Sequence, residues 1–342
     1  MKAIIFYEHG GPEVLRPEER PEPRVRADEV LVEVRACALN HLDVWARGGL
    51  PGVKIPLPHI LGNDIAGVVR EAGELVDWVA PGDEVMLQPG VSCGHCHECL
   101  RGADNLCPDY QILGYQRDGG YAELVAAPAV NCIPKPKHLS WEEAAALPLV
   151  TVTAWHMLVA RAQLKPGEDV LIHAAGSGVG SIGIQVAKLL GARVIATAST
   201  EEKLEKARAL GADELVNYTR EDWPKEVRRL TGKKGVEVVF EHTGADTWPG
   251  SIQALARDGR LVTCGATSGY DARTDIRQVF YRHLSVLGSF MGSKSELLDA
   301  MRFVERGAIR AVVDRTLPLA EARRAHELME DRAQFGKLVL VP

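Results

Sequence analysis

The chain has 342 residues, a length that suggests about two domains. Its composition, 46% apolar and 25% charged, is that of an ordinary globular protein. The net charge of −6 argues against a general nucleic-acid binder, which usually carries a basic excess. No apolar run approaches the roughly 18 residues that cross a bilayer, and the segment Met1–His9 meets a Glu too early for a signal peptide. We therefore expect a cytoplasmic protein without a membrane or nucleic-acid partner.

Two patterns follow each other along the chain. The first 130 residues are rich in Pro and Gly and carry short β-type runs such as Val30–Arg35 and Ala66–Val69, which predict a small, irregular, strand-rich domain. From about residue 140, apolar strands alternate with helices, which predicts a parallel sheet covered on both faces. We expect strands at 169–174, 193–198, 214–216, 236–240, 260–264 and 284–289, helices at 183–190, 201–210, 295–306 and 319–331, and a last strand at 337–341.

Four of the seven cysteines, Cys93, Cys96, Cys99 and Cys107, follow the spacing C-x2-C-x2-C-x7-C. An odd cysteine count in a cytosolic chain argues against a disulfide framework. Four thiolates at such short spacing close a tetrahedral zinc site and leave no open position for substrate, so we expect one structural zinc per chain. Iron–sulfur ligation is the competing use of clustered cysteines. The scattered Cys132 and Cys264 lie in apolar contexts typical of buried thiols.

A glycine-rich turn follows the strand expected at 169–174. Gly178, Gly180 and Gly183 satisfy G-x-G-x-x-G between a strand and a helix, the context that supports dinucleotide binding. Without Cβ atoms, the backbone N–H groups can approach a pyrophosphate at the positive end of the helix. A plain tight turn is the alternative. The segment expected to bind the cofactor comprises Ala175, Gly176, Ser177, Gly178, Val179 and Gly180.

The end of the second strand bears on the choice of cofactor. An Asp or Glu is expected there in NAD sites, where it binds the ribose 2′-OH. Here the strand ends Thr197-Ala198-Ser199-Thr200, and the first acid is Glu201. Because Ser199 and Lys203 can bind a 2′-phosphate, we expect NADP(H) to be preferred, with NAD(H) as the alternative. The alternative is that Lys203 is an ordinary solvated lysine.

Together these features resemble the medium-chain dehydrogenase/reductase family over essentially the whole chain. The resemblance rests on the cysteine lobe, the glycine turn and the segments Gly62–Val69, Pro81–Val85 and Phe335–Leu340. It implies an α/β fold with a GroES-like, partly open barrel built from both chain ends and a doubly wound Rossmann domain between them. On that basis we expect the GroES-like domain at 1–129 and 294–342, the Rossmann domain at 130–293, and the active site in the cleft.

Two branches of that family differ at the active site. Zinc alcohol dehydrogenases hold a catalytic zinc with a Cys, with a His in a Gly-His-Glu motif, and with a further Cys or acid. Here Asn40, Asn63 and Leu149 stand at those places, and Asp64 keeps only the acid of the motif. Asn amides and a Leu side chain are poor zinc ligands.

The pattern Asn40-x-x-Asp43-x-x-x-Arg47-x-Gly49 resembles instead the quinone oxidoreductase branch, which usually lacks a cysteine lobe. A catalytic zinc rebuilt from nearby residues remains an alternative. Cys37 would need a three-residue register slip to serve as its ligand, and an odd slip reverses the face of an extended segment. The candidates for such a rebuilt site are Cys37, His41, His59 and Asp64.

The resemblance implies hydride transfer from NAD(P)H to a quinone, an enone or a similar conjugated carbonyl acceptor. We expect the Asn40 amide to donate to the developing oxyanion, His41 to donate a proton or to point outward, and Asp43 to orient its neighbours. The candidate catalytic residues are Asn40, His41, Asp43, Asn63, Asp64 and Thr153. By resemblance, Thr153 lies against the nicotinamide, Tyr218 flanks the adenosine phosphate, Lys337 lies near the pyrophosphate, and Gly265 belongs to the cofactor site.

Other functions and the assembly state also follow from these patterns. Zinc-dependent alcohol oxidation is the second enzymatic hypothesis, and a non-catalytic NADPH-binding protein is the third. We expect a homodimer, with a tetramer as the alternative, joined through the uncharged edge strand Leu284–Ser289, because an open sheet leaves an edge that a two-fold axis can pair.

Overall fold

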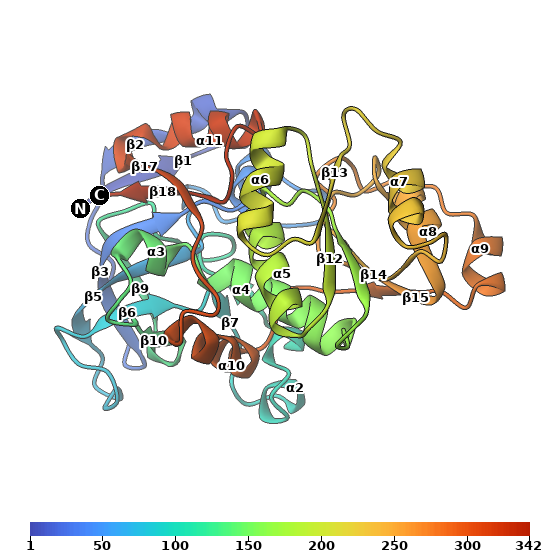
Figure 1. Ribbon diagram of the computed structural model, residues 1–342. Helices are drawn as coiled ribbons and strands as arrows, with labels where there is room; N and C mark the ends of the chain where they lie inside the picture. Colours follow the sequence, from blue (N-terminus) through green and yellow to red (C-terminus); the bar gives the residue numbers. More distant parts are fainter. The chain divides into compact units, whose positions relative to one another are not determined.

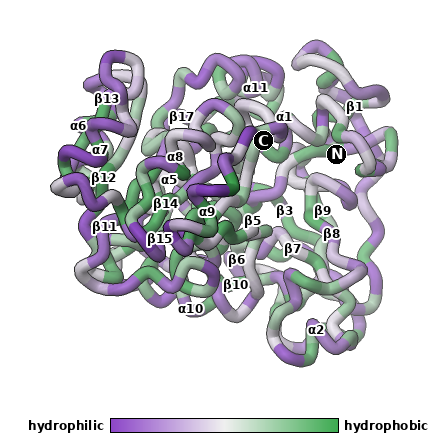
Figure 2. The backbone as a smooth tube through the Cα atoms, turned by 90° about the vertical axis from the view of Figure 1, so that its right-hand side faces the viewer, coloured by the Kyte–Doolittle hydropathy of each residue, from purple (hydrophilic) through white to green (hydrophobic).

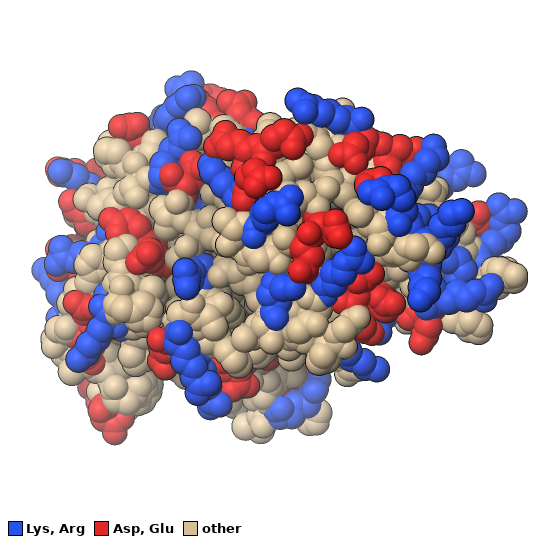
Figure 3. Space-filling model, in the orientation of Figure 1, with Lys and Arg blue, Asp and Glu red and all other residues tan.

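The computed structural model describes residues 1–342 and divides into two compact units (Figure 1). The strand-rich unit comprises residues 1–149, 293–295 and 311–342, and the Rossmann unit comprises residues 150–292 and 296–310. No helix has the length and apolar character needed to cross a membrane. Lysine and arginine side chains are interspersed with acidic ones over the face shown in Figure 3.

The strand-rich unit contains a seven-stranded sheet with strand order β10-β6-β5-β3-β18-β17, and β9 pairs with β3 as well. The last strand of the chain lies between strands from distant segments, because Val339 pairs with Ala38 on one side and Thr316 on the other. These strands are β3 (Glu29–Ala38), β5 (Asp64–Ala72), β6 (Glu84–Leu87), β9 (Leu124–Pro128), β10 (Cys132–Pro134), β17 (Val313–Pro318) and β18 (Lys337–Val341).

Smaller elements complete this unit. A three-stranded sheet joins β1 (Lys2–Phe6), β2 (Arg16–Glu19) and β4 (His59–Ile60), and β7 (Gly90–Val91) pairs with β8 (Gln111–Ile112). The α-helices are α1 (His41–Gly48), α2 (His97–Leu100), α3 (Trp141–Ala145) and α11 (Ala322–Glu330). The 3-10 helices are η1 (Pro12–Val14), η2 (Asp104–Leu106), η3 (Ala129–Asn131) and η5 (Leu319–Glu321).

The Rossmann unit is built on a six-stranded parallel sheet with strand order β13-β12-β11-β14-β15-β16. Its strands are β11 (Asp169–Ile172), β12 (Arg193–Ala198), β13 (Glu214–Asn217), β14 (Val236–Glu241), β15 (Leu255–Thr263) and β16 (Ser285–Gly288). Its helices are α4 (Pro148–Trp155), the π-helix η4 (His156–Arg161), α5 (Gly178–Leu189), α6 (Glu201–Ala209), α7 (Trp223–Leu230), α8 (Trp248–Ala254), α9 (Ile276–Tyr281) and α10 (Lys294–Glu305). This is the doubly wound order expected for dinucleotide binding.

Burial explains why these segments form strands. Val238, Val239 and Phe240 of β14 are fully buried, and β14 lies among the hydrophobic segments of Figure 2. In Figure 1, α5 and α6 cover one face of the sheet and α7 and α8 cover the other. A Cβ added at Gly183 of α5 would lie 3.2 Å from the Phe240 ring, so glycine allows close packing of that helix on the sheet.

The expected α/β architecture, with a parallel Rossmann sheet and a separate strand-rich domain, is confirmed. The expected boundary at 129/130 moves to 149/150, because β10 pairs with β6 and α3 packs on β3 and β5. The helix at 294–305, expected in the GroES-like domain, falls largely in the Rossmann unit. There Phe303 stacks on Trp155, and Glu296 pairs with His156 at 2.9 Å.

Candidate active site and metal centre

Three polar side chains from distant strands meet inside the strand-rich unit. Asn40 follows β3, Asp64 begins β5 and Lys337 begins β18. The Lys337 ammonium lies 2.5 Å from Asn40 Oδ1 and 2.9 Å from Asp64 Oδ2, and Asn40 Nδ2 donates to the same carboxylate oxygen at 2.9 Å. All three side chains are buried, so this is a compensated ion pair and not a surface contact. We call these three residues the Lys337 network.

The network fixes the orientation of the Asn40 amide. An ammonium only donates and a carboxylate only accepts, so the amide oxygen faces Lys337 and the amide nitrogen faces Asp64. One N–H of Asn40 Nδ2 is used by Asp64. The amide carries a second N–H, and therefore Asn40 can serve as a hydrogen-bond donor whose plane is held on both sides.

The second oxygen of Asp64 holds a distant backbone group. Asp64 Oδ1 accepts from the backbone N–H of Leu149 at 2.7 Å. Leu149 is the last residue of the strand-rich unit before the chain enters the Rossmann unit. The contribution of Leu149 to this site is thus its backbone N–H, a group that any residue but proline supplies.

Asp43 joins the two segments that carry Asn40 and Asp64. From the first turn of α1, its carboxylate accepts from the backbone N–H of Asn40 at 2.7 Å and from that of Gly62 at 3.0 Å. Burial raises the pKa of Asp43 to about 7, although both amide donors act to lower it. Gly62 has φ +103°, and a Cβ there would lie 2.7 Å from Cys37 Sγ, so this approach requires glycine. Asp43 is a positioning residue here.

The remaining polar candidates each have different contacts and lie outside the Lys337 network. Asn63 is fully buried and donates to the Leu113 carbonyl at 2.7 Å. His41 is partly exposed at the start of α1, with its ring edge-to-face on Trp45 at a centroid distance of 5.1 Å. His59 Nδ1 lies 3.3 Å from Asp118, and burial raises the pKa of Cys37 well above its usual range. Cys37, His41, His59 and Asp64 do not form a cluster of metal ligands, whereas the four lobe cysteines do.

Lys337 is a candidate cofactor residue whose ammonium is already paired in the structure. Its resemblance-based role near the pyrophosphate requires an available ammonium. In the structure Lys337 is 3% exposed, and its ammonium is bound by Asp64 and Asn40. A buried ammonium needs a counter-ion, and the carboxylate that pairs with it here is that of Asp64.

The four lobe cysteines are brought together as expected. Their sulfur atoms all lie within 4.8 Å of one another, with Cys93–Cys99 at 3.9 Å and Cys96–Cys99 at 3.5 Å. A zinc tetrahedron with Zn–S bonds of about 2.3 Å places sulfur atoms roughly 3.8 Å apart, so the geometry fits the ion. The backbone N–H groups of His95 and Cys96 lower the pKa of the Cys93 thiol to about 6. Although the Cys99 N–H acts to lower the pKa of Cys96, burial and the neighbouring thiols raise it to about 11, so in the absence of metal Cys93 ionises before Cys96.

The glycine turn forms the start of α5. Ser177 caps the helix by accepting from the Gly180 N–H at 2.9 Å, and Ala174 turns the chain with φ +44°. A Cβ at Gly180 would lie 2.5 Å from the Ala174 carbonyl oxygen, which explains the glycine there. The segment from Ala175 to Gly180 therefore presents the first turn of a 12-residue helix, a suitable site for a phosphate.

The carboxyl end of β12 carries no acid at its last residue, and the first carboxylate after it, that of Glu201, is 63% exposed. Ala198 is buried, and Glu201 is held by Asn217 Nδ2 at 2.8 Å and by Arg220 at 3.3 Å. Lys203 belongs to the first turn of α6, and its backbone N–H is capped by Thr200. The other expected cofactor residues in this unit are Ser199, partly exposed; Tyr218, 40% exposed after β13; Gly265, after β15; and Thr153, buried in α4.

Sequence reasoning missed a buried network at the carboxyl edge of the parallel sheet. Ser251 donates to the fully buried Glu241 at 2.7 Å and lies 2.9 Å from His173 Nε2, while Thr197 lies 3.3 Å from His173 Nδ1. Burial lowers the pKa of His173 to about 4, so the ring is neutral near pH 7. Since Ser251 donates to Glu241, His173 Nε2 carries the proton and Nδ1 accepts from Thr197. Only the polar His at the end of an apolar strand hinted at this network.

Comparisons with known proteins agree with this geometry. The alcohol dehydrogenase GroES-like domain matches residues 26–137, and the zinc-binding dehydrogenase domain matches residues 178–306. A solved NAD-dependent alcohol dehydrogenase is 55% identical, with a TM-score of 0.97 and full coverage of both chains. The NAD-dependent alcohol dehydrogenase of Sulfurisphaera tokodaii is 33% identical over 100% of both chains.

Two further relatives have different names. Quinone oxidoreductase 1 of Escherichia coli is 32% identical over 99% of both chains. The crotonyl-CoA reductase of Streptomyces collinus is 34% identical over 94% of this chain and 80% of its own. The chain is thus a two-unit, nicotinamide-dependent oxidoreductase. It belongs to the medium-chain dehydrogenase/reductase family, which confirms the resemblance found in its motifs.

The metal centre yields a first prediction. Cys99→Ser removes one of four thiolates and should abolish zinc retention, lowering the melting temperature while cofactor binding is kept, because the dinucleotide turn lies in the other unit. Zinc content by mass spectrometry and calorimetric melting are the measurements. Protein that is purified without metal and melts at the same temperature as the zinc-loaded form would contradict the assignment.

The Lys337 network yields a second prediction. Lys337→Met leaves the buried Asp64 carboxylate without its cation and should cost about 3–5 kcal/mol of unfolding free energy. Adding Asp64→Asn should restore part of that loss, because the unpaired charge is then gone. Urea unfolding of both variants measures the coupling, with Lys54→Met as the exposed lysine control. Equal losses for Lys337→Met and Lys54→Met would refute the ion pair.

Proposed function

We propose that this protein reduces a quinone, an enone or a similar conjugated carbonyl acceptor with NADPH, without a catalytic zinc. The observation that carries the proposal is the Lys337 network. Where a zinc alcohol dehydrogenase would place its first metal ligand, this chain has an amide whose oxygen accepts from an ammonium 2.5 Å away. A zinc ion there would have to displace a buried cation paired with Asp64.

The rest of the donor set also fits zinc poorly. Asn63, at the position expected for a His ligand, donates its amide to the Leu113 carbonyl, and Leu149 contributes only its backbone N–H. Zinc in proteins prefers thiolate, imidazole and carboxylate ligands. Without a Lewis acid nothing lowers the pKa of an alcohol, so reduction of an activated acceptor suits these residues better than alcohol oxidation.

The bound dinucleotide supplies the hydride. Asn40 offers its second amide N–H to the oxygen on which negative charge develops, and the Lys337 network keeps that amide from rotating. His41, partly exposed beside Asn40, is the proposed proton donor for the product. Thr153 is proposed to lie against the nicotinamide, as the family resemblance implies.

NADP(H) is the proposed cofactor form. Ser199 follows β12 and Lys203 lies in the first turn of α6, and these two residues are proposed to bind the 2′-phosphate. The nearby Glu201 accepts from Asn217 and pairs with Arg220. Tyr218, exposed after β13, is proposed to flank the adenosine. β12 ends at Ala198, so no acid stands at the position from which an NAD site binds the ribose 2′-OH.

Zinc-dependent alcohol oxidation is the second candidate, because the 55% identical solved structure is named an NAD-dependent alcohol dehydrogenase. One assay separates the candidates: purified protein is tested with quinones, enones and alcohols, each with both cofactors, and its zinc is counted. We expect NADPH oxidation with conjugated acceptors and one zinc per chain. Two zinc ions with alcohol oxidation would establish the second candidate, and NADPH binding without turnover would establish a non-catalytic protein.

The cofactor assignment predicts the effect of a charge reversal. Lys203→Glu should weaken NADPH binding by about tenfold or more while changing NADH binding less, since only NADPH carries the 2′-phosphate. The matched control is Lys206→Glu, which makes the same charge change on the same helix. Binding is measured by fluorescence titration. Native protein that uses NADH as well as NADPH would contradict the assignment.

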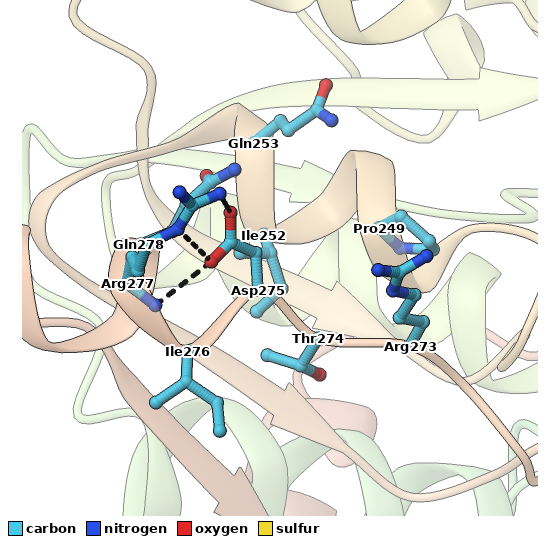
Figure 4. A pocket seen from close by; sticks show the side chains of 9 residues that line it. All are labelled: Pro249, Ile252, Gln253, Arg273, Thr274, Asp275, Ile276, Arg277 and Gln278. Atoms are coloured by element: carbon cyan, nitrogen blue, oxygen red, sulfur yellow. Dashed lines mark hydrogen bonds and ion pairs between the residues drawn. The ribbon is translucent and has the colours of Figure 1, made fainter.

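We also propose a homodimer that covers the edge of the Rossmann sheet, with a tetramer as the alternative. β16 is the last strand of that sheet, and its Val286 is 44% exposed. The chain segment from residue 270 to residue 290, which includes β16, also exposes the apolar side chains of Tyr270, Ile276, Phe280, Tyr281 and Phe290. Beside them, α8 and α9 border a surface hollow of about 460 Å³ in which Asp275 binds Arg277 (Figure 4). A second copy paired along β16 would bury this apolar surface.

Val286→Lys should therefore shift the particle toward one 37.2 kDa chain in light scattering at micromolar concentration. Leu298→Lys, at an apolar position on α10 that is 52% exposed, is the control and should leave the mass unchanged. A native mass of a single chain would exclude the dimer. An unchanged dimer mass for Val286→Lys would place the interface elsewhere.

A further inference from the structure

Residues 293–295 form a short segment of the strand-rich unit between two stretches of the Rossmann unit, and we call this segment the excursion. The chain leaves the Rossmann unit after Gly292, contributes residues 293–295 to the strand-rich unit and returns to the Rossmann unit at Glu296. α10 begins within this excursion, at Lys294. The first N–H groups of a helix have no partner within it and need one from elsewhere. Contacts to residues 293–295 therefore position both the chain segment that passes between the units and the start of α10.

The excursion is held by residues of the cysteine lobe. Asp104 Oδ1 accepts from the backbone N–H of Lys294 at 2.9 Å, and Asp104 Oδ2 lies 3.2 Å from the Lys294 ammonium. The same ammonium lies 3.3 Å from Ser92 Oγ. Asp104 thus caps α10 from a segment 190 residues away, and its negative charge suits the positive end of the helix.

Ser92 and Asp104, the two residues that contact Lys294, are both positioned by the cysteine loop. Ser92 directly precedes Cys93, and the carbonyl of Asp104 accepts from the N–H of Cys107 at 3.1 Å. The lobe has little apolar packing of its own, since Leu100 and Leu106 are largely exposed. A loop without a hydrophobic core depends on its metal for shape.

We propose that the zinc lobe is a clamp on this passage of the chain: through Asp104 and Ser92, metal binding at the four cysteines holds residues 293–295 and the first turn of α10. The effect of the zinc then extends beyond its own loop. Loss of the metal releases the passage while the sheets of both units remain folded. This inference is independent of the substrate and cofactor proposed above.

Hydrogen exchange with mass spectrometry tests the clamp on the full-length, zinc-loaded protein. In Asp104→Ala, amides of residues 292–297 should exchange about tenfold faster or more, because the Lys294 N–H loses its acceptor, while one zinc per chain is retained. Asp109→Ala changes an exposed carboxylate of the same lobe and should leave that exchange unchanged. Removing zinc from the native protein with a chelator should accelerate the same peptide.

A second variant is needed because Asp104→Ala could prevent the cysteine lobe from folding. Lys294→Met lies outside the cysteine loop and removes both ammonium contacts, so it should retain zinc and accelerate exchange at 292–297 by a smaller factor. The clamp is refuted if Asp104→Ala exchanges there like the native protein. It is equally refuted if zinc removal accelerates residues 93–107 and leaves 292–297 protected.

Discussion

The buried ion pair between Lys337 and Asp64 joins the starts of two strands that lie far apart in the sequence of the strand-rich unit. An unpaired ammonium or carboxylate inside a protein is costly, so each group requires the other, and Asn40 completes the pair with hydrogen bonds. Lys337 stands at the start of the last strand, and Asp64 stands at the start of β5. The pairing of β18 with β3 and the burial of these charges therefore depend on each other.

The architecture was readable from the sequence because it rests on periodicity and on glycine. Apolar runs such as Val236–Phe240 form parallel strands, and helices end near Gly191 and Gly211, where positive φ angles suit glycine. The cysteine spacing likewise predicted a cluster that the fold brings together. Periodicity, helix-ending glycines and cysteine spacing are local features of the sequence, so they predict these elements without any knowledge of distant contacts.

The site was less predictable because its contacts span most of the chain. Lys337 lies 297 residues from Asn40, and no local pattern distinguishes a lysine that meets a buried carboxylate from one that meets a phosphate. The partners of His173 are hidden in the same way, since Ser251 lies 78 residues away. The domain boundary at 149/150 also depends on long-range pairing, that of β10 with β6, which composition does not reveal.

One arrangement recurs where the chain passes between its units. At the first passage, the Asp64 carboxylate accepts from the backbone N–H of Leu149, and at a later one the Asp104 carboxylate accepts from that of Lys294. Each carboxylate is itself fixed by a cation or by the cysteine loop, not by apolar packing. Carboxylates suit this task because a helix start offers N–H groups that must find acceptors. The Lys337 network and the cysteine lobe share no residue, yet each supplies a carboxylate that accepts from a backbone N–H where the chain passes between the units.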